Sequence, residues 1–202
     1  MHKSYDHRFK SEVITIYPGE YYISSSKEII TTILGSCVAV CLYDLENNIA
    51  GMNHFMLPEG SLNINELITK DLHLNISHIS DKAMMYGIES MDVLIYMMQK
   101  KGAERRNLRA KIFGGGQILS NMTKKPSIGE QNIKFAKSYL NTEQITIENE
   151  SVSDTYGRRI YFLTGTSSVF VKKIITDRVI KEELKYKEKL KELKFKPDIT
   201  LY

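Results

Sequence analysis

A predicted β-hairpin is the sequence feature that most constrains the fold. Residues 38–44 (VAVCLYD) and 49–57 (IAGMNHFML) are two apolar, strand-like runs, and the turn-forming segment LENN separates them. If the loop closes symmetrically, with two or four residues, Asp44 lies opposite Ile49. This register then determines which side chains of the two strands share a face.

The predicted register brings a cysteine and a histidine to the same face. It pairs Ala39 with His54, and side chains alternate between faces along a strand, so Cys37 becomes a diagonal neighbour of His54. Cα atoms of such pairs lie roughly 7–8 Å apart, which an imidazole can span. A three-residue loop would instead shift the register by one and put the two groups on opposite faces.

This pair suits nucleophilic catalysis. A thiol with a pKa near 8.5 is only a few per cent ionised at pH 7, and an adjacent imidazole can take its proton and later pass it to a leaving amine. Gly35 and Ser36 allow a sharp turn before Cys37, where backbone amides can face an oxyanion. A hydroxyl of Thr31 or Thr32 can orient the imidazole. The alternative is structural: a buried thiol acting as a small hydrophobe beside a hydrogen-bonded histidine.

The other segments predict an α+β sandwich of mixed sheets, because many strands accompany only two core helices without strict alternation. The predicted strands are 13–17, 21–24, 28–34, 109–113, 145–148, 158–163 and 168–174, and helical spacing of apolar residues predicts a helix over 81–101. Ser127 and Glu130 have capping-box spacing before a second helix.

Length and composition predict one domain. The chain has 202 residues, of which 42% are hydrophobic, enough for a sizeable core. We expect a flexible tail over residues 1–12, the folded domain over 13–175, and a charged helix and tail over 176–202. The apolar stripe of this last helix is thin, so the helix is either solvated or docks in a partner's groove.

The sequence favours a cytoplasmic protein that inserts in no membrane. It has no apolar run near the roughly 20 residues of a membrane span and no secretory signal. Cys37 and Cys41 would lie about 13 Å apart on one strand, beyond disulfide reach. A formal charge of +4 is too weak to indicate nucleic-acid binding.

No metal or cofactor site is predicted. Gly114, Gly115 and Gly116 lack the lysine and hydroxyl residue of a phosphate-binding loop, and we expect them to permit close backbone packing beside the site. His73 and His78 have no acidic or thiol partner at ligand spacing, so zinc is not expected.

Several motifs resemble the CheD family of chemoreceptor glutamine deamidases. TTILGSCVAVCLYD and GMNHFMLP carry the resemblance first, and it continues through SM..LI..M...GA, AKIFGGG, IGEQNIKF and GRRIYFLTG. It covers roughly residues 13–175. The family pattern has a Gly-Gly pair where Tyr156-Gly157 stands here and an arginine at Gln131, differences that concern docking of substrate or partner rather than catalysis.

The resemblance implies a three-layer α+β sandwich of mixed β-sheets with two core helices on one side. It implies a Cys-His-Thr triad, with Cys37 as the nucleophile, His54 as the base and Thr31 as the third member, and no metal or organic cofactor. Backbone amides around Gly35 and Ser36 would hold the oxyanion.

The implied substrates are glutamine side chains on the cytoplasmic helices of methyl-accepting chemotaxis receptors, hydrolysed to glutamate during adaptation. The implied partner is the chemotaxis phosphatase CheC. One alternative is a protein that binds and activates this phosphatase with little hydrolysis of its own. Another is transglutamination by the same thiol chemistry.

Overall fold

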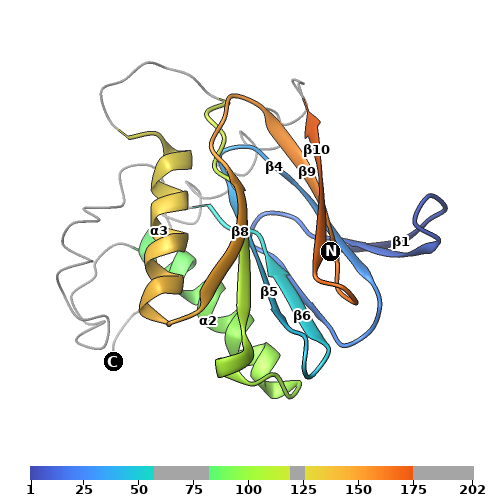
Figure 1. The fold of residues 1–202 in the computed structure, drawn as a ribbon. Coiled ribbons are helices and arrows are strands. Elements are labelled where there is room, and N and C mark those ends of the chain that lie inside the picture. Colours follow the sequence, from blue (N-terminus) through green and yellow to red (C-terminus); the bar gives the residue numbers. More distant parts are fainter. Residues whose placement is uncertain (57–81, 119–125, 175–202) are drawn as a thin grey trace, which may run out of the picture.

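The computed structural model describes residues 1–56, 82–118 and 126–174. Two five-stranded sheets pack face to face, and helices α2 and α3 cover the outer face of one of them (Figure 1). The predicted three-layer α+β sandwich with two helices on one side is therefore confirmed.

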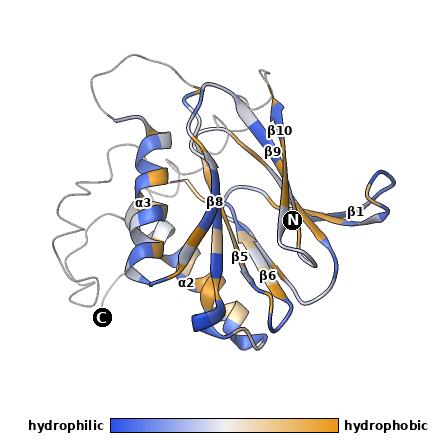
Figure 2. Ribbon diagram, viewed as in Figure 1, coloured by the Kyte–Doolittle hydropathy of each residue, from blue (hydrophilic) through white to orange (hydrophobic). Residues whose placement is uncertain are grey.

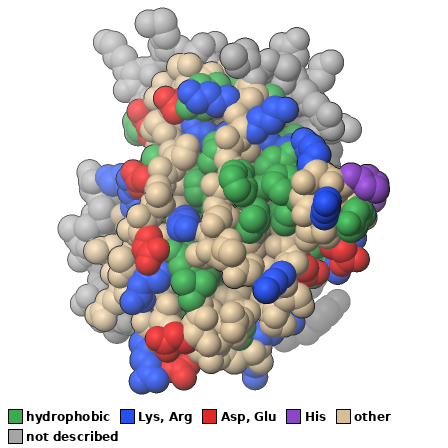
Figure 3. Space-filling model, turned by 45° about the vertical axis from the view of Figure 1, so that its right-hand side comes forward, with side chains coloured by type: hydrophobic (Ala, Val, Ile, Leu, Met, Phe, Trp, Pro, Cys, Tyr) green, Lys and Arg blue, Asp and Glu red, His purple; other side chains and the backbone are tan. Residues whose placement is uncertain are grey.

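The first sheet, sheet A, has no helix on its outer face in the described part of the chain. β2 and β4 run parallel, and every other neighbouring pair is antiparallel. Its strands, in spatial order, are β1 (His2–Asp6), β2 (Ser11–Thr15), β4 (Ile29–Leu34), β9 (Gly157–Leu163) and β10 (Ser168–Ile174). On the view of Figure 3, hydrophobic side chains gather beside Lys and Arg side chains.

The second sheet, sheet B, lies in the middle of the sandwich and contains the predicted hairpin at its centre. β7 and β8 run parallel, and the other neighbouring pairs are antiparallel. Its strands, in spatial order, are β3 (Tyr21–Ser24), β6 (Ile49–Asn53), β5 (Val38–Asp44), β7 (Arg109–Gly114) and β8 (Thr146–Val152).

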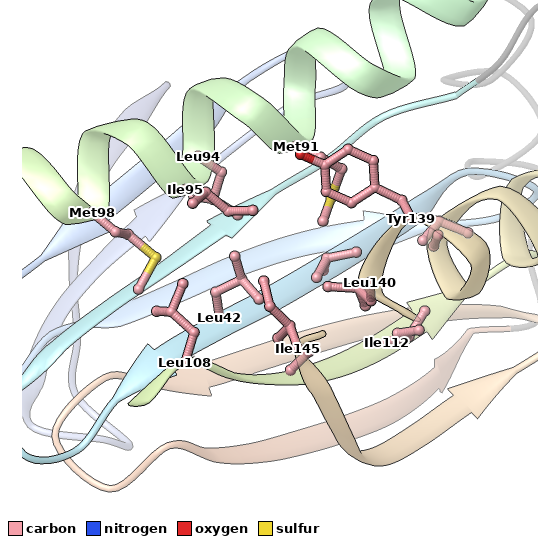
Figure 4. Packing of buried hydrophobic residues seen from close by; sticks show 14 of the residues in the cluster. Leu42, Met91, Leu94, Ile95, Met98, Leu108, Ile112, Tyr139, Leu140 and Ile145 are labelled. Atoms are coloured by element: carbon pink, nitrogen blue, oxygen red, sulfur yellow. The ribbon is translucent and has the colours of Figure 1, made fainter. Parts of the chain in front are cut away.

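Both predicted core helices are present. α2 spans Lys82–Lys100 and α3 spans Ile128–Thr142, and a short 3-10 helix, η2 (Arg105–Asn107), follows α2. The predicted capping box begins α3: the Ser127 hydroxyl accepts from the Glu130 amide, and the Glu130 carboxylate accepts from the Ser127 amide. Figure 4 shows side chains of both helices meeting those of sheet B in one core.

The alternation of side chains along β5 divides the interior into two cores. Val38, Val40 and Leu42 face the helices, whereas Ala39 and Cys41 face sheet A. Every residue of β5 is buried, which explains why its sequence is apolar almost throughout (Figure 2). Even-numbered apolar residues of β5 therefore lie in the core beneath the helices, and odd-numbered ones lie in the core between the two sheets.

Part of the segment 1–12, for which we expected a flexible tail, forms a strand in the structure. His2–Asp6 forms β1, which pairs with β2 in an antiparallel ladder from His2 opposite Thr15 to Asp6 opposite Ser11. The segment is polar and mostly exposed, so it carries no amphipathic signal, and backbone pairing to the sheet edge supplies its order.

Some predictions fall outside the described residues: those for His73 and His78, and the charged helix of 176–202. Within the described ranges, no helix combines the length and apolar character needed to cross a bilayer.

Candidate active site

The hairpin register is the one that brings Cys37 and His54 to a common face. Asp44 lies opposite Ile49, and the pairing resumes beyond the ladder where Val38 and Phe55 exchange both backbone hydrogen bonds, at 3.0 and 2.9 Å. The last pair of the ladder is Cys41 opposite Met52, and the two residues on each strand between it and the Val38–Phe55 pair keep the register, which sets Ala39 opposite His54. LENN is thus a four-residue loop, which is one of the two loop lengths that give the predicted register.

The Cys37 thiol and the His54 imidazole both lie in the core between the two sheets. Cys37 packs in the same cluster as Ala39 and Cys41, and His54 contacts a residue of β4 in sheet A. Each of the two side chains is only 1% exposed. A substrate therefore reaches the sulfur only when neighbouring atoms move aside.

The ladder between β5 and β6 is interrupted just before His54. The Val40 amide donates to the side-chain oxygen of Asn53 at 3.0 Å, and the Asn53 side-chain amide donates to the Ser90 carbonyl of α2 at 3.2 Å. The backbone of His54 pairs instead with the turn before β3, donating to the Glu20 carbonyl and accepting from the Gly19 amide. This turn fixes the place of the imidazole.

The hydrogen bonds of Thr32 fix the tautomer of His54. The Thr32 hydroxyl donates to the Ile16 carbonyl at 2.8 Å, so its oxygen can only accept from Nδ1 of His54, also at 2.8 Å. With the proton on Nδ1, Nε2 carries a lone pair. Nε2 is buried and has no hydrogen-bond partner among the described residues. This is the form that a general base requires.

The structure places Thr32, not Thr31, beside the imidazole. Side chains of consecutive strand residues point to opposite faces, and Thr31 points away from His54 and donates to the Ile160 carbonyl of β9 at 2.7 Å. The threonine hydroxyl that contacts His54 in the structure is thus that of Thr32, one residue further along β4 than the Thr31 that the resemblance to CheD implies.

Burial keeps His54 neutral. It lowers the pKa of His54 to about 3, because an imidazolium ion has no water to solvate it in this core. A neutral imidazole is ready to accept a proton at any pH near neutrality. An imidazolium formed during a reaction gains stability only from an anion that forms beside it, such as a thiolate.

The lowered pKa also predicts a pH-dependent stability. Between about pH 6.5 and 3 the unfolded chain binds a proton at His54 that the folded chain does not, so stability falls as the pH falls through this window. We expect the stability advantage of the wild type over His54→Gln, which does not titrate, to shrink by about 2 kcal/mol from pH 7 to pH 5. Urea unfolding of both proteins at the two pH values measures it, and a constant difference would contradict the buried neutral imidazole.

The turn before Cys37 is held by the glycines that follow β7. The Gly116 amide donates to the Gly35 carbonyl at 2.6 Å, and the Gly115 amide donates to the Cys37 carbonyl at 2.7 Å. At Gly114 an added Cβ would come well under 3.0 Å from the Cys37 carbonyl oxygen. The expectation that these glycines allow close backbone packing beside the site is confirmed.

Arg158 donates to the backbone at the first of these glycines. Nothing in the sequence indicated this role. The Arg158 side chain is fully buried, and its guanidinium donates to the carbonyls of Gly114, Ser151 and Ser153. An arginine in a strand normally reads as a surface residue, so no sequence signal marked it. Its N–H groups thus connect the end of β7 with the end of β8 and with the residue that follows β8.

Cys41 lies in the core between the sheets, four residues after Cys37 and on strand β5. It is fully buried, and burial raises the pKa of its thiol, which Lys111 lowers only in part. Within the described ranges, no three His, Cys, Asp or Glu side chains are grouped as metal ligands.

Comparisons with known proteins agree on one family. The model of the family CheD, described as CheD chemotactic sensory transduction, matches residues 72–173. A probable chemoreceptor glutamine deamidase CheD 2 of Chromobacterium violaceum is 41% identical over 94% of this chain and 88% of its own length. A probable chemoreceptor glutamine deamidase CheD of Methylobacillus flagellatus is 40% identical over 98% of this chain and 93% of its own. A protein of the same name from Laribacter hongkongensis is 38% identical over 98% and 91%.

Proposed function

We propose that this chain, which belongs to the CheD chemotactic sensory transduction family, is a cysteine hydrolase that deamidates glutamine side chains of chemoreceptors. The names of its relatives support the substrate and the reaction. The burial of Cys37 and of a His54 with an unpartnered Nε2 in the core between the two sheets supports the mechanism.

In the first half of the reaction, His54 Nε2 takes the proton of the Cys37 thiol. The thiolate attacks the δ-carbon of the glutamine amide, and the electron pair of the C=O bond moves to oxygen. Backbone N–H groups of the Gly35–Cys37 turn donate to this oxyanion. The imidazolium then gives its proton to the nitrogen, the C–N bond breaks, and ammonia leaves a thioester on Cys37.

In the second half, water hydrolyses the thioester. His54 takes a proton from the water, the resulting hydroxide attacks the thioester carbon, and the C–S bond breaks. The sulfur regains the proton from His54. The balance is one glutamine and one water in, one glutamate and one ammonia out, and the enzyme returns to its starting state.

The observation that carries this proposal is the hydrogen bond between Nδ1 of His54 and the Thr32 hydroxyl, which itself donates to the Ile16 carbonyl. A proton on Nδ1 leaves the lone pair on Nε2, in the same layer as the Cys37 thiol. Incubation of the full chain with receptor cytoplasmic fragments, followed by mass spectrometry, tests it: each glutamine converted gains about 1 Da. An unchanged receptor mass would overturn the proposal, and incorporation of an added primary amine would indicate transglutamination instead.

A matched pair of substitutions tests the role of Thr32. Thr31 and Thr32 are adjacent, buried and hydrogen-bonded, so valine at either position removes one buried hydroxyl from β4 at a similar cost of about 1 kcal/mol. We expect Thr32→Val to lower kcat for deamidation by about 10–100-fold, because the imidazole loses the acceptor that holds its tautomer. We expect Thr31→Val to stay within about threefold of wild type. Equal losses of kcat in the two variants would contradict a specific role for the Thr32 hydroxyl.

Two further properties implied by the resemblance to CheD stay predictions. One is a cytoplasmic location, where the receptor helices lie. The other is binding of the phosphatase CheC, which would compete with receptors if both approach the Cys37 turn.

A further inference from the structure

The carbonyl groups of three consecutive residues at the cysteine turn all accept hydrogen bonds. Gly35 and Cys37 accept from the glycine amides after β7, and Ser36 between them accepts from the side-chain amide of Asn132 at 2.8 Å. Asn132 is fully buried. It is 96 residues away from Ser36 in the sequence.

Helix α3 delivers the Asn132 amide to this place. Asn132 lies in the second turn of the helix, whose first turn is fixed by its capping box. Gly129, one turn earlier, packs on Gly115 and Gly116 so closely that a Cβ there would fall well under 3.0 Å from the Gly115 carbonyl. The helix and the glycine loop therefore form one rigid backing for the turn that carries Cys37.

The bond to the Ser36 carbonyl sets the direction of the next amide. The described peptide bonds are all trans, so the C=O of Ser36 and the N–H of Cys37 point in opposite directions. The following peptide shows the same relation: the Cys37 carbonyl faces Gly115 of the β7 side, and the Val38 amide faces Phe55 on the opposite side. With its carbonyl held by Asn132, the Ser36–Cys37 peptide aims the Cys37 N–H away from α3.

We infer that Asn132 is a positioning residue that orients the Cys37 N–H toward the oxyanion of the acyl-transfer step. The inference rests on the acyl-transfer chemistry of the proposed function, in which the amide of the nucleophile itself is a donor to the oxyanion. Removing one such donor costs about 10²–10³ in kcat, so its misalignment should cost about 10–100-fold.

Two probes separate this role from simple support of the fold. Acetylation by p-nitrophenyl acetate passes through an oxyanion, whereas alkylation by iodoacetamide is a direct displacement at carbon and does not. Both are measured at Cys37 in the full chain carrying Cys41→Ala, so that Cys37 is its only cysteine. In Asn132→Ala we expect the acetylation rate to fall about 10–100-fold and the alkylation rate to stay within about threefold.

Gln131→Ala is the matched control. Its side-chain amide also donates to a backbone carbonyl, that of Pro126 at 2.9 Å, from the adjacent position of the same helix. We expect this variant to keep both rates. Parallel losses of both rates in Asn132→Ala, or no loss of either, would overturn the inference, as would a wild-type Cys37 that p-nitrophenyl acetate fails to acetylate.

Asn132→Asp provides a second test with nearly unchanged shape. A protonated carboxyl can donate to the Ser36 carbonyl, whereas an ionised one cannot and repels it. The acetylation rate of the variant relative to wild type should therefore fall at least about tenfold as the pH rises through the pKa of the new carboxyl, while relative alkylation stays level. A flat acetylation ratio would contradict the inference. If receptors remain unmodified by a wild type that shows the expected probe ratios, the proposed substrate is wrong and the role of Asn132 stands.

Discussion

Replacement of Cys37 by alanine is expected to lower glutamine deamidation at least about 10³-fold, because no other group can form the thioester. The matched control is Cys41→Ala, on the same strand and face. The Cys41 thiol is fully buried and its pKa is raised by burial, so little thiolate forms there. We expect the control to retain activity within about threefold at a temperature where both proteins are folded.

The measurement is the receptor mass shift followed over time, with circular dichroism to verify that each protein is folded. Cys37→Ala with undiminished activity would remove the thioester mechanism. Equal losses in both variants would show that a thiol on this face matters only for packing. Cys37 is only 1% exposed, so any reagent reaches it only when the site opens. A receptor fragment that occupies the opened site should therefore also slow the alkylation of Cys37.

Gly114→Ala is expected to destabilise the fold by at least about 3 kcal/mol and to remove activity. The backbone of Gly114 has a φ of 108°, which is unfavourable for alanine, and the new methyl group would collide with the Cys37 carbonyl and approach Val38. Relief of this collision must move either the cysteine turn or the end of β7. Either movement also displaces Arg158, which donates to the Gly114 carbonyl.

Gly102→Ala separates the collision from the backbone strain. Gly102 has nearly the same φ, 104°, but the nearest atom to its added Cβ is Ile49 Cδ1 at 3.8 Å, an ordinary contact. We expect this control to lose about 1 kcal/mol and to stay active. Urea unfolding and the mass-shift assay compare the two variants. Similar losses of stability in both would show that close packing at Gly114 has no consequence.

The local pattern of the hairpin was enough to predict that Cys37 and His54 share a face. A four-residue turn and alternation along two strands fix which residues share a face, and both properties are readable from neighbouring residues. The choice between Thr31 and Thr32 was different in kind. It depends on which face of β4 meets sheet B, and this is set by pairing to β2 and β9 and by the packing of the two sheets.

The supporting residues were beyond sequence reasoning for the same physical reason. Asn132 and Arg158 act on backbone carbonyls 96 and 44 positions away, and any carbonyl offers the same acceptor. Their types predict exposure, and only the close approach of α3 and the glycine loop converts them into buried donors. Strand β1 was missed because its polar residues gain order from the edge of a sheet rather than from burial.

Because the ladder is interrupted at Asn53, the backbone of His54 and the backbone of β5 have different hydrogen-bond partners. β5 stays rigid through its ladders on both sides, while the segment at His54 takes its position from the short turn at Gly19 and Glu20. A change in the length of that turn would move the imidazole without moving the thiol. The spacing between the imidazole and the thiol can therefore be adjusted by insertions or deletions at this turn, which is far from both residues in the chain.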